Sequence, residues 1–155
     1  MNKIPTALIL LSSALLWGHP NAIRGGDKAR EPATIDVVVT GLRNQNGQIC
    51  VSLFSSKTGF PDKPEKAFRT SKSRITGNEV KVGFDALPTG TYAIAALHDE
   101  DMNGKMNTSF WGFPKEGGGA SNNPKPRRGP PRYEDAKFQL EKTHLTLQIK
   151  LIYPR

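Results

Sequence analysis

Residues 80–97 read VKVGFDALPTGTYAIAAL, and this stretch decides the expected fold. Apolar side chains occupy alternate positions over 80–84, which is the period-two pattern of a strand with one buried face. The turn-forming sequence Leu-Pro-Thr-Gly follows at 87–90, and an apolar run resumes over 91–97. The stretch therefore predicts two short strands joined by a tight turn.

Similar patterns recur on both sides of this stretch. They predict further strands over about residues 34–42, 48–55, 69–76, 138–140 and 145–153. A two-residue hairpin turn is expected at Gly77-Asn78, and 56–68 is expected to be a loop ending in at most one helical turn. With roughly seven short strands and no amphipathic helix of useful length, the chain is expected to be an all-β, antiparallel sandwich.

The 155 residues suit one ordinary domain, preceded by a segment of different composition. Residues 1–22 combine Lys3 with a short apolar run and predict a secretory signal peptide, with an uncleaved anchor as the alternative. We expect a flexible tether over 23–33, a single β-sandwich domain over 34–155, and a periplasmic or secreted location, with no transmembrane segment after cleavage. The single cysteine, Cys50, excludes an intramolecular disulfide.

One long loop interrupts the strand pattern at 98–132. Within 112–131, ten of the twenty residues are Gly or Pro. Long loops without secondary structure of their own are uncommon inside compact domains and are usually functional or disordered. The functional residues are therefore expected in this Gly/Pro-rich loop.

An acidic motif, D-x-D-x-N-G, opens this loop at residues 99–104. Side-chain oxygens at alternate positions converge on one point when the backbone curls around Ca²⁺, a hard cation that takes six to eight oxygen ligands. The motif predicts a calcium site formed by Asp99, Asp101, Asn103, the backbone carbonyl of Lys105, Asn107 and, as a remote ligand, Glu116.

The motif departs from a true EF-hand at its twelfth position. Phe110 stands where an EF-hand has a bidentate Glu, so we expect weak affinity, with a Kd on the order of 10⁻⁴–10⁻³ M. The alternative is a polar turn in which Asp and Asn side chains only cap backbone groups.

Residues 84–93, FDALPTGTYA, resemble the F-x-x-L-P-x-G-x-Y corner of prealbumin-like and related sandwich domains of exported bacterial proteins. Together with the HDE motif at 98–100, NGK at 103–105, GFP at 112–114 and AKF at 136–138, the pattern over 34–153 resembles the bacterial domain-of-unknown-function family 2141. The resemblance implies an Ig-like or prealbumin-like sandwich and export, but no activity. The family has Asn where Asp101 stands and Asp where Asn107 stands. Tyr92 is expected to pack as a corner tyrosine.

The net charge of +8 arises from 22 basic and 14 acidic residues, and four cations fall within residues 125–132. A binding surface for an anionic cell-envelope component is predicted at Lys125, Arg127, Arg128, Arg132 and Trp111. A nucleic-acid partner is not expected, because the basic stretch has no interleaved stacking aromatics. The three aromatics Phe110, Trp111 and Phe113 either form an exposed platform for a sugar or peptide or, the interpretation favoured here, pin the loop onto the sandwich.

We expect the protein to be non-enzymatic. His98, next to the acidic motif, is expected to be a structural hydrogen-bonding group, and the less favoured alternative is a metal-assisted hydrolase centred on it. The leading prediction is thus an exported β-sandwich module whose long loop is organised by Ca²⁺. Its alternative is an envelope-binding module that acts through the basic segment.

Overall fold

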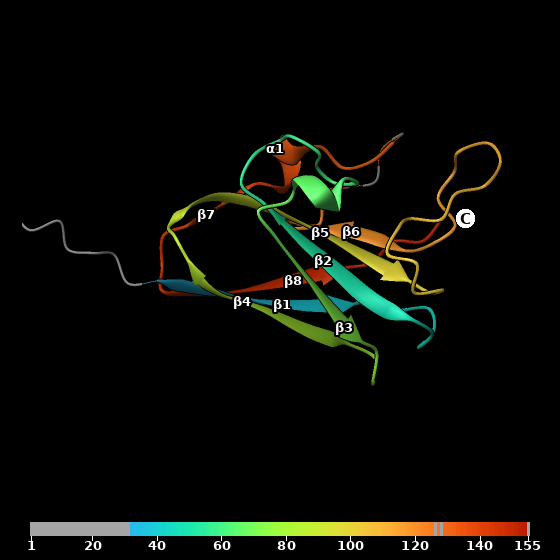
Figure 1. The fold of residues 1–155 in the computed structure, drawn as a ribbon, viewed down its shortest axis with the longest axis horizontal. Coiled ribbons are helices and arrows are strands. Elements are labelled where there is room, and N and C mark those ends of the chain that lie inside the picture. The colour runs from blue at the N-terminus through green and yellow to red at the C-terminus, as the bar shows by residue number, and fades with distance from the viewer. Residues whose placement is uncertain (1–31, 126, 128, 155) are drawn as a thin grey trace, which may run out of the picture.

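The structure is a computed structural model that describes residues 32–125, 127 and 129–154. The expected signal peptide, and all of the expected tether except residues 32 and 33, lie outside the described residues. Two β-sheets pack face to face, and their strands cross obliquely in Figure 1. The sandwich prediction is therefore confirmed.

The smaller sheet has three strands in the order β4-β1-β8. Its members are β1 (Ala33–Thr40), β4 (Val80–Leu87) and β8 (His144–Lys150). β1 pairs antiparallel with β4 but parallel with β8, with Val37 opposite Val82 on one side and Leu147 on the other. This parallel pair is an exception to the antiparallel pattern that the sequence predicted.

The larger sheet contains five strands, four of them in the order β3-β2-β5-β6, with β7 pairing with β5 farther along. Its members are β2 (Gln48–Phe54), β3 (Arg69–Arg74), β5 (Gly90–Asp99), β6 (Gly118–Ala120) and β7 (Phe138–Leu140). The turn expected at Gly77-Asn78 joins β3 to β4, which belong to different sheets. It therefore carries the chain from one sheet to the other and does not form a hairpin.

The core lies between the two sheets and is built from alternating apolar side chains. In β1 the residues that point inward are fully buried, while their neighbours are only partly covered. Tyr92 at the start of β5 is also buried, and its hydroxyl donates to the carbonyl of Pro88 at 2.9 Å. This hydrogen bond closes the Leu-Pro-Thr-Gly turn and confirms the corner role expected for Tyr92.

A second, smaller apolar cluster covers the outer face of β2 and β5. It is formed by the short helix α1 (Tyr133–Ala136) and by the loop that contains the 3₁₀ turn η1 (Pro64–Lys66). Phe60 lies edge-on between Phe54 and Tyr133, with ring centroids 5.3 and 5.8 Å away. Because both faces are covered, β2 and β5 lack the solvent-exposed face that strict alternation predicted.

The segment 100–117 leaves the sandwich where β5 ends and returns where β6 begins. It lies at the right-hand end of the molecule in Figure 1. Since β5 and β6 pair directly, from Leu97 opposite Gly118, both ends of this segment are anchored on neighbouring strands. The fold therefore brings Asp99 and Glu116, which lie far apart in the sequence, to the same edge of the larger sheet.

Candidate metal centre

Asp99 is the last residue of β5, and its carboxylate organises the turn that follows. It is fully buried and accepts backbone N–H groups from Asn103 at 3.0 Å and Gly104 at 2.8 Å. Gln48, opposite it on β2, donates its side-chain amide at 2.7 Å. The φ of +79° at Gly104 lets the chain curl back onto this carboxylate. Asp99 is thus held in place by two strands and a turn.

Glu116 holds the other end of the segment. Its side chain is buried, and its two carboxylate oxygens accept the backbone N–H groups of Glu100 at 2.9 Å and Asn107 at 2.8 Å. Burying a carboxylate is costly unless hydrogen bonds compensate the charge, and these two bonds supply that compensation. Glu116 therefore ties together the start, the middle and the end of the segment.

Asp101 is the exposed member of the group. Its carboxylate accepts the side-chain amide N–H groups of Asn103 at 2.9 Å and Asn107 at 2.8 Å. These hydrogen bonds, with the contribution from Asn107 the largest, hold the pKa of Asp101 below its ordinary value. Asp101 is therefore ionised at neutral pH.

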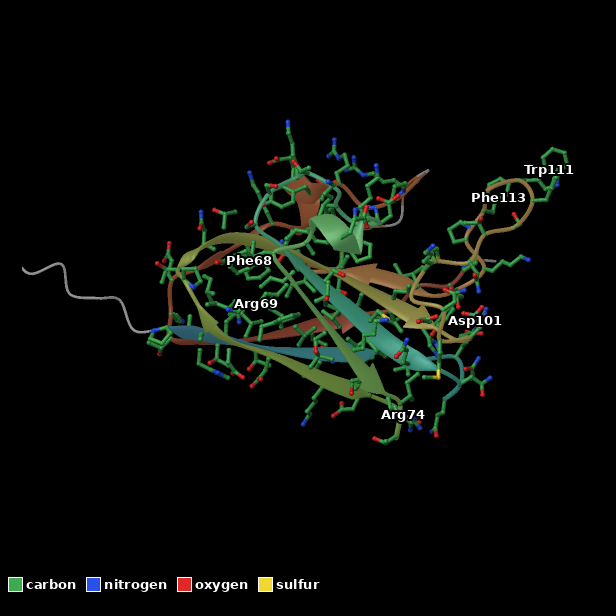
Figure 2. The ribbon with its side chains drawn as sticks, in the orientation of Figure 1. Phe68, Arg69, Arg74, Asp101, Trp111 and Phe113 are labelled. Carbon is green, nitrogen blue, oxygen red and sulfur yellow. The ribbon has the colours of Figure 1, made fainter. Side chains whose placement is uncertain are left out.

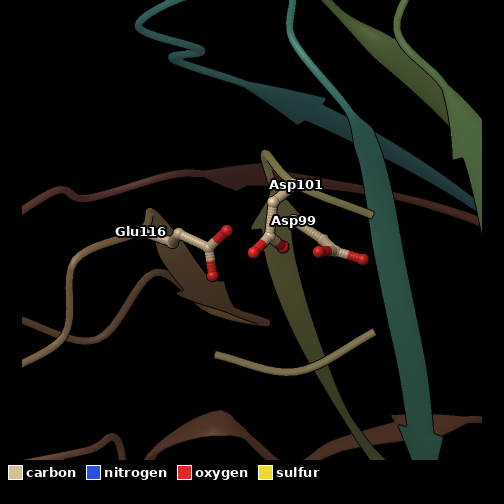
Figure 3. Close-up of side chains that lie close together, drawn as sticks. All are labelled: Asp99, Asp101 and Glu116. Atoms are coloured by element: carbon tan, nitrogen blue, oxygen red, sulfur yellow. The ribbon is translucent and has the colours of Figure 1, made fainter. Parts of the chain in front are cut away.

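Asp99, Asp101 and Glu116 converge at one point, as Figure 3 shows. One carboxylate oxygen from each lies within 4.8 Å of the others, a separation that a single cation can bridge. All three donors are hard anionic oxygens, which suit Ca²⁺ or Mg²⁺ better than a soft transition metal. The residues present thus fit a hard divalent cation.

The other predicted ligands, Asn103, Asn107 and Lys105, lie next to these carboxylates but donate N–H groups in place of the predicted ligand oxygens. Asn103 and Asn107 present their amide N–H groups to Asp101, and Asn103 also donates to the Asn107 side-chain oxygen at 2.8 Å. Rotating either amide by 180° exchanges its N–H for its oxygen, so both side chains can turn a ligand atom towards a cation. The backbone N–H of Lys105 donates to Asn103 Oδ1 at 2.7 Å, and ligation by the Lys105 carbonyl stays a prediction.

A match to a family model covers residues 37–148, most of the sandwich and the whole acidic segment. The family is described as uncharacterized protein conserved in bacteria, DUF2141. The chain belongs to this family. No curated protein and no solved structure matched the chain. Among the helices of the described residues, none has the length and apolar character needed to cross a membrane.

His98 of this DUF2141 protein is fully buried, and both of its ring nitrogens are engaged. Nε2 lies 2.8 Å from the Asn46 carbonyl, which can only accept, so Nε2 carries the proton. Nδ1 lies 2.7 Å from the Tyr153 hydroxyl, and that hydroxyl accepts the backbone N–H of Arg43 at 3.2 Å. In the neutral imidazole Nδ1 is then an acceptor and the Tyr153 hydroxyl donates to it, so that His98 links the turn at Asn46, β5 and the C-terminal segment.

Three further residues that support the segment were not predicted from any sequence pattern. Arg43 forms a two-bond ion pair with Glu100, at 2.6 and 3.0 Å, and donates to the Lys115 carbonyl at 3.0 Å. The hydrogen bond from Arg43 holds the pKa of Glu100 below its ordinary value. Arg43 also stacks over the Tyr153 ring, 4.8 Å from its centroid. Arg43, Tyr153 and Gln48 come from distant turns and strands, so no local motif identifies them.

Cys50 lies on β2 next to the buried carboxylate of Asp99. Its Sγ is 3.6 Å from Asp99 Oδ2. Burial, followed by the negative charge of Asp99, raises the pKa of the Cys50 thiol to about 11. The thiol is therefore protonated at neutral pH and acts as a weak donor to Asp99.

Gly47 allows the preceding turn to pack against the start of the acidic segment. Its φ is +71°, and a Cβ at this position would lie 2.0 Å from the carbonyl oxygen of Asp99. Any side chain here would displace the Asp99 backbone. This close approach places the 44–47 turn, which includes the Asn46 carbonyl bonded to His98, directly against the site.

The aromatic residues of the segment do not pin it to the sandwich, so the favoured interpretation of them is wrong. Phe110, Trp111 and Phe113 are 94, 80 and 68% exposed, and Figure 2 shows Trp111 and Phe113 projecting away from the body. The reason is that the chain from 107 to 115 closes on itself through backbone hydrogen bonds and leaves the sandwich as a separate projection.

The basic segment forms a separate surface that leads into α1. Lys125 and Arg127 are exposed, whereas Arg132 pairs with Asp135 of α1 at 2.9 and 3.0 Å. Arg128 lies outside the described residues. Figure 1 shows this segment beside α1, apart from the projection that carries Trp111, so the four described residues of the predicted partner-binding set do not form one patch.

Proposed function

We propose that this protein is an exported β-sandwich module without catalytic activity, in which Ca²⁺ organises the segment between β5 and β6. The observation that carries the proposal is the convergence of Asp99, Asp101 and Glu116 within 4.8 Å at both ends of that segment. Two of these carboxylates are buried, and like charges at this distance repel one another. A divalent cation would turn this repulsion into attraction and fix the segment.

The chemistry of the donors favours calcium over other metals. The nearest nitrogen and sulfur ligands, His98 and Cys50, are engaged in hydrogen bonds, and the Cys50 thiol keeps its proton. Each of the three carboxylates has an oxygen that accepts only one N–H group and so keeps a lone pair for a cation. Ca²⁺ accepts carboxylate and amide oxygens in flexible geometry. The expected affinity is weak, with a Kd on the order of 10⁻⁴–10⁻³ M, in the range of extracellular calcium modules.

The absence of catalysis is supported by the state of His98, on which the hydrolase alternative is centred, and of Cys50, the single thiol of the chain. The hydrolase alternative needs a base or metal ligand that can reach a substrate. His98 is buried with both nitrogens bonded, and Cys50 is a protonated thiol behind Asp99. Export rests on the composition of residues 1–22.

Thermal unfolding of the full chain in calcium or in EGTA tests this proposal. A ligand that binds only the folded state at ten times its Kd stabilises that state by about 1.4 kcal/mol, which raises the Tm by about 3–6 °C in a chain of this size. Asp101→Asn should abolish most of this rise, because it removes a ligand charge while keeping the side-chain shape. Asp101 is exposed, so the variant should fold normally.

The matched control is Asp62→Asn, which removes one exposed acidic charge from the loop before η1. It should leave the calcium-dependent rise unchanged. Equal Tm values in 10 mM calcium and in EGTA would contradict the proposal. So would a calcium response that Asp101→Asn and Asp62→Asn reduce equally, since this would indicate general screening of charge.

A further inference from the structure

Residues 107–115 form a compact projection, here called the aromatic finger. Its base is closed by a hydrogen bond from the Lys115 N–H to the Asn107 carbonyl at 2.8 Å and by a β-bridge between Thr108 and Pro114. At its tip the Ser109 N–H donates to the Phe113 carbonyl at 2.7 Å, and the Ser109 hydroxyl accepts the Phe113 N–H at 3.1 Å. The finger is therefore a folded structure, with its tip held in a defined shape.

The tip displays three large aromatic side chains to solvent. Phe110, Trp111 and Phe113 are the most exposed large hydrophobic residues of the described chain. Scattered single apolar residues are normal on a surface, but a contiguous exposed apolar patch marks an interaction site. In Figure 2, Trp111 lies at the outermost point of the molecule on this side, with Phe113 on the same tip, where they would meet a partner first.

The geometry of the rings argues against a flat sugar-binding platform. Phe110 and Trp111 are packed edge to face, with an angle of 86° between their planes and 5.4 Å between centroids. Their faces cannot form one plane on which a sugar ring stacks. A convex knob of non-coplanar rings instead suits insertion into a soft medium that needs no matching pocket.

Part of the backbone of the finger is hydrogen-bonded internally, which favours shallow insertion at the water-facing level of a membrane over deep burial. An unsatisfied N–H or C=O is costly in an apolar environment, and structures that enter a membrane bond these groups internally. In the finger, the N–H groups of Ser109, Gly112, Phe113 and Lys115 all donate within the finger itself. Tryptophan is also enriched at the interface between lipid and water, because its ring is amphipathic.

Two lysines flank the base of the finger, beside the acidic group. Lys105 and Lys115 are both exposed there, next to the carboxylates of Asp99, Asp101 and Glu116, and the whole chain carries a net charge of +8. Lysines at the level of the lipid headgroups are attracted to anionic lipids, and each contributes about 1 kcal/mol near such a surface. Apolar rings ahead of these two lysines suit an anionic bilayer, which has an apolar interior beneath a negative surface, while the three neighbouring carboxylates oppose that attraction.

We propose that the aromatic finger docks the protein on anionic lipid membranes by inserting Phe110, Trp111 and Phe113 into the bilayer interface. This proposal does not depend on calcium. The hydrogen bond from the Asn107 N–H to Glu116 places the base of the finger next to the carboxylates of Asp99, Asp101 and Glu116. These carboxylates repel anionic lipid, and a bound cation would reduce that repulsion. Calcium is thus expected to strengthen docking without being required for it.

Trp111 provides a direct probe of insertion. The chain has two tryptophans, so the full-length Trp17→Phe variant leaves Trp111 as the single one. With vesicles of phosphatidylcholine containing about 30% phosphatidylglycerol, its emission should shift to the blue, and brominated acyl chains should quench it. An emission spectrum that stays unchanged at saturating lipid would overturn the proposal and would leave a protein pocket as the partner of the finger.

Vesicle sedimentation of the full chain measures how much the finger contributes. The triple variant F110S/W111S/F113S should lower the partition coefficient at least tenfold, while Phe68→Ser, which removes an exposed aromatic far from the finger, should leave it within twofold.

Lys105→Gln and Lys115→Gln should each weaken binding about fivefold on anionic vesicles, and not on pure phosphatidylcholine. Residues 1–22 are common to all variants, so the differences report the finger.

Equal partitioning of the wild-type protein and the triple variant would overturn the proposal. Each comparison is made twice, in EGTA and in 1 mM calcium. If calcium binding fails, the difference between the wild-type protein and the triple variant persists in both buffers. If membrane docking fails, that difference is missing in both, whatever calcium does to the Tm.

Discussion

The β-sandwich and the segment between β5 and β6 place opposite kinds of side chain in their interiors. Between the sheets, inward-pointing residues such as Val37, Ile94 and Ile149 are fully buried and apolar. In the segment, the carboxylates of Asp99 and Glu116 are buried and the aromatic residues of the finger face solvent. The two regions are therefore stabilised by different interactions.

The two kinds of interaction differ in how strongly they depend on direction. Burial of apolar surface has no preferred direction, so the sandwich depends on the volume and fit of its side chains. The segment depends on directed hydrogen bonds, in which each carboxylate oxygen has a named N–H partner. Volume changes should thus disturb the sandwich most, and loss of an acceptor should disturb the segment most.

The largest effect is expected in the sandwich. Ile94→Ala removes a fully buried side chain from the centre of β5 and leaves a cavity, so we expect a loss of about 2–5 kcal/mol in the free energy of unfolding. Ile152→Ala removes the same atoms from a half-exposed position after β8 and should cost less than about 1 kcal/mol. Chemical denaturation measures both. Equal losses would mean that the core is not the main source of stability.

The same contrast explains which parts of the fold the sequence could predict. Strands β1 and β4 carry regular apolar alternation, because one face of each meets the core, and β5 carries an apolar run, because both of its faces are covered. The ends of these strands were predicted to within three residues. Strand β6 was missed because its sequence is Gly-Gly-Ala, which has no side-chain pattern. The parallel pairing of β1 with β8, and the passage from β3 to β4 between sheets, depend on contacts between distant residues.

The candidate metal site could likewise be predicted only in part from the sequence. The spacing of Asp99 and Asp101 is local, so the sequence predicted both, and the return of Glu116 to them was foreseen as a remote contribution. Arg43 and Tyr153 were missed, because the fold brings them together across 110 residues of chain. The exposure of the aromatic finger was predicted wrongly because hydrophobic residues are usually buried, and only the closed backbone of 107–115 shows why these are not.

An intermediate effect is expected from loss of the buried acceptor in the segment. Glu116→Ala leaves the N–H groups of Glu100 and Asn107 without their partner, which costs about 1–3 kcal/mol. Glu116→Gln keeps one acceptor oxygen and should lie between the wild-type protein and the alanine variant. Hydrogen exchange should show loss of protection at these two amides.

The matched control is Glu79→Ala, which removes an exposed carboxylate before β4 that lies 3.8 Å from Lys81. Its cost should stay within about 0.5 kcal/mol. If the two alanine variants are equally stable, the hydrogen bonds to Glu116 contribute nothing to the segment, and the contrast between the two regions disappears.

The smallest effect on folding is expected from the aromatic finger. The triple variant F110S/W111S/F113S removes more apolar surface than Ile94→Ala does, yet its free energy of unfolding should change by no more than about 0.5 kcal/mol, since these rings are already in water. Phe54→Ala, which removes one buried ring, should cost about 3–5 kcal/mol. A loss in the triple variant approaching that of Phe54→Ala would show that the rings pack against the protein in solution. An unchanged stability would instead mean that three large apolar side chains are retained at the surface without contributing to the fold, as expected if they serve an external contact.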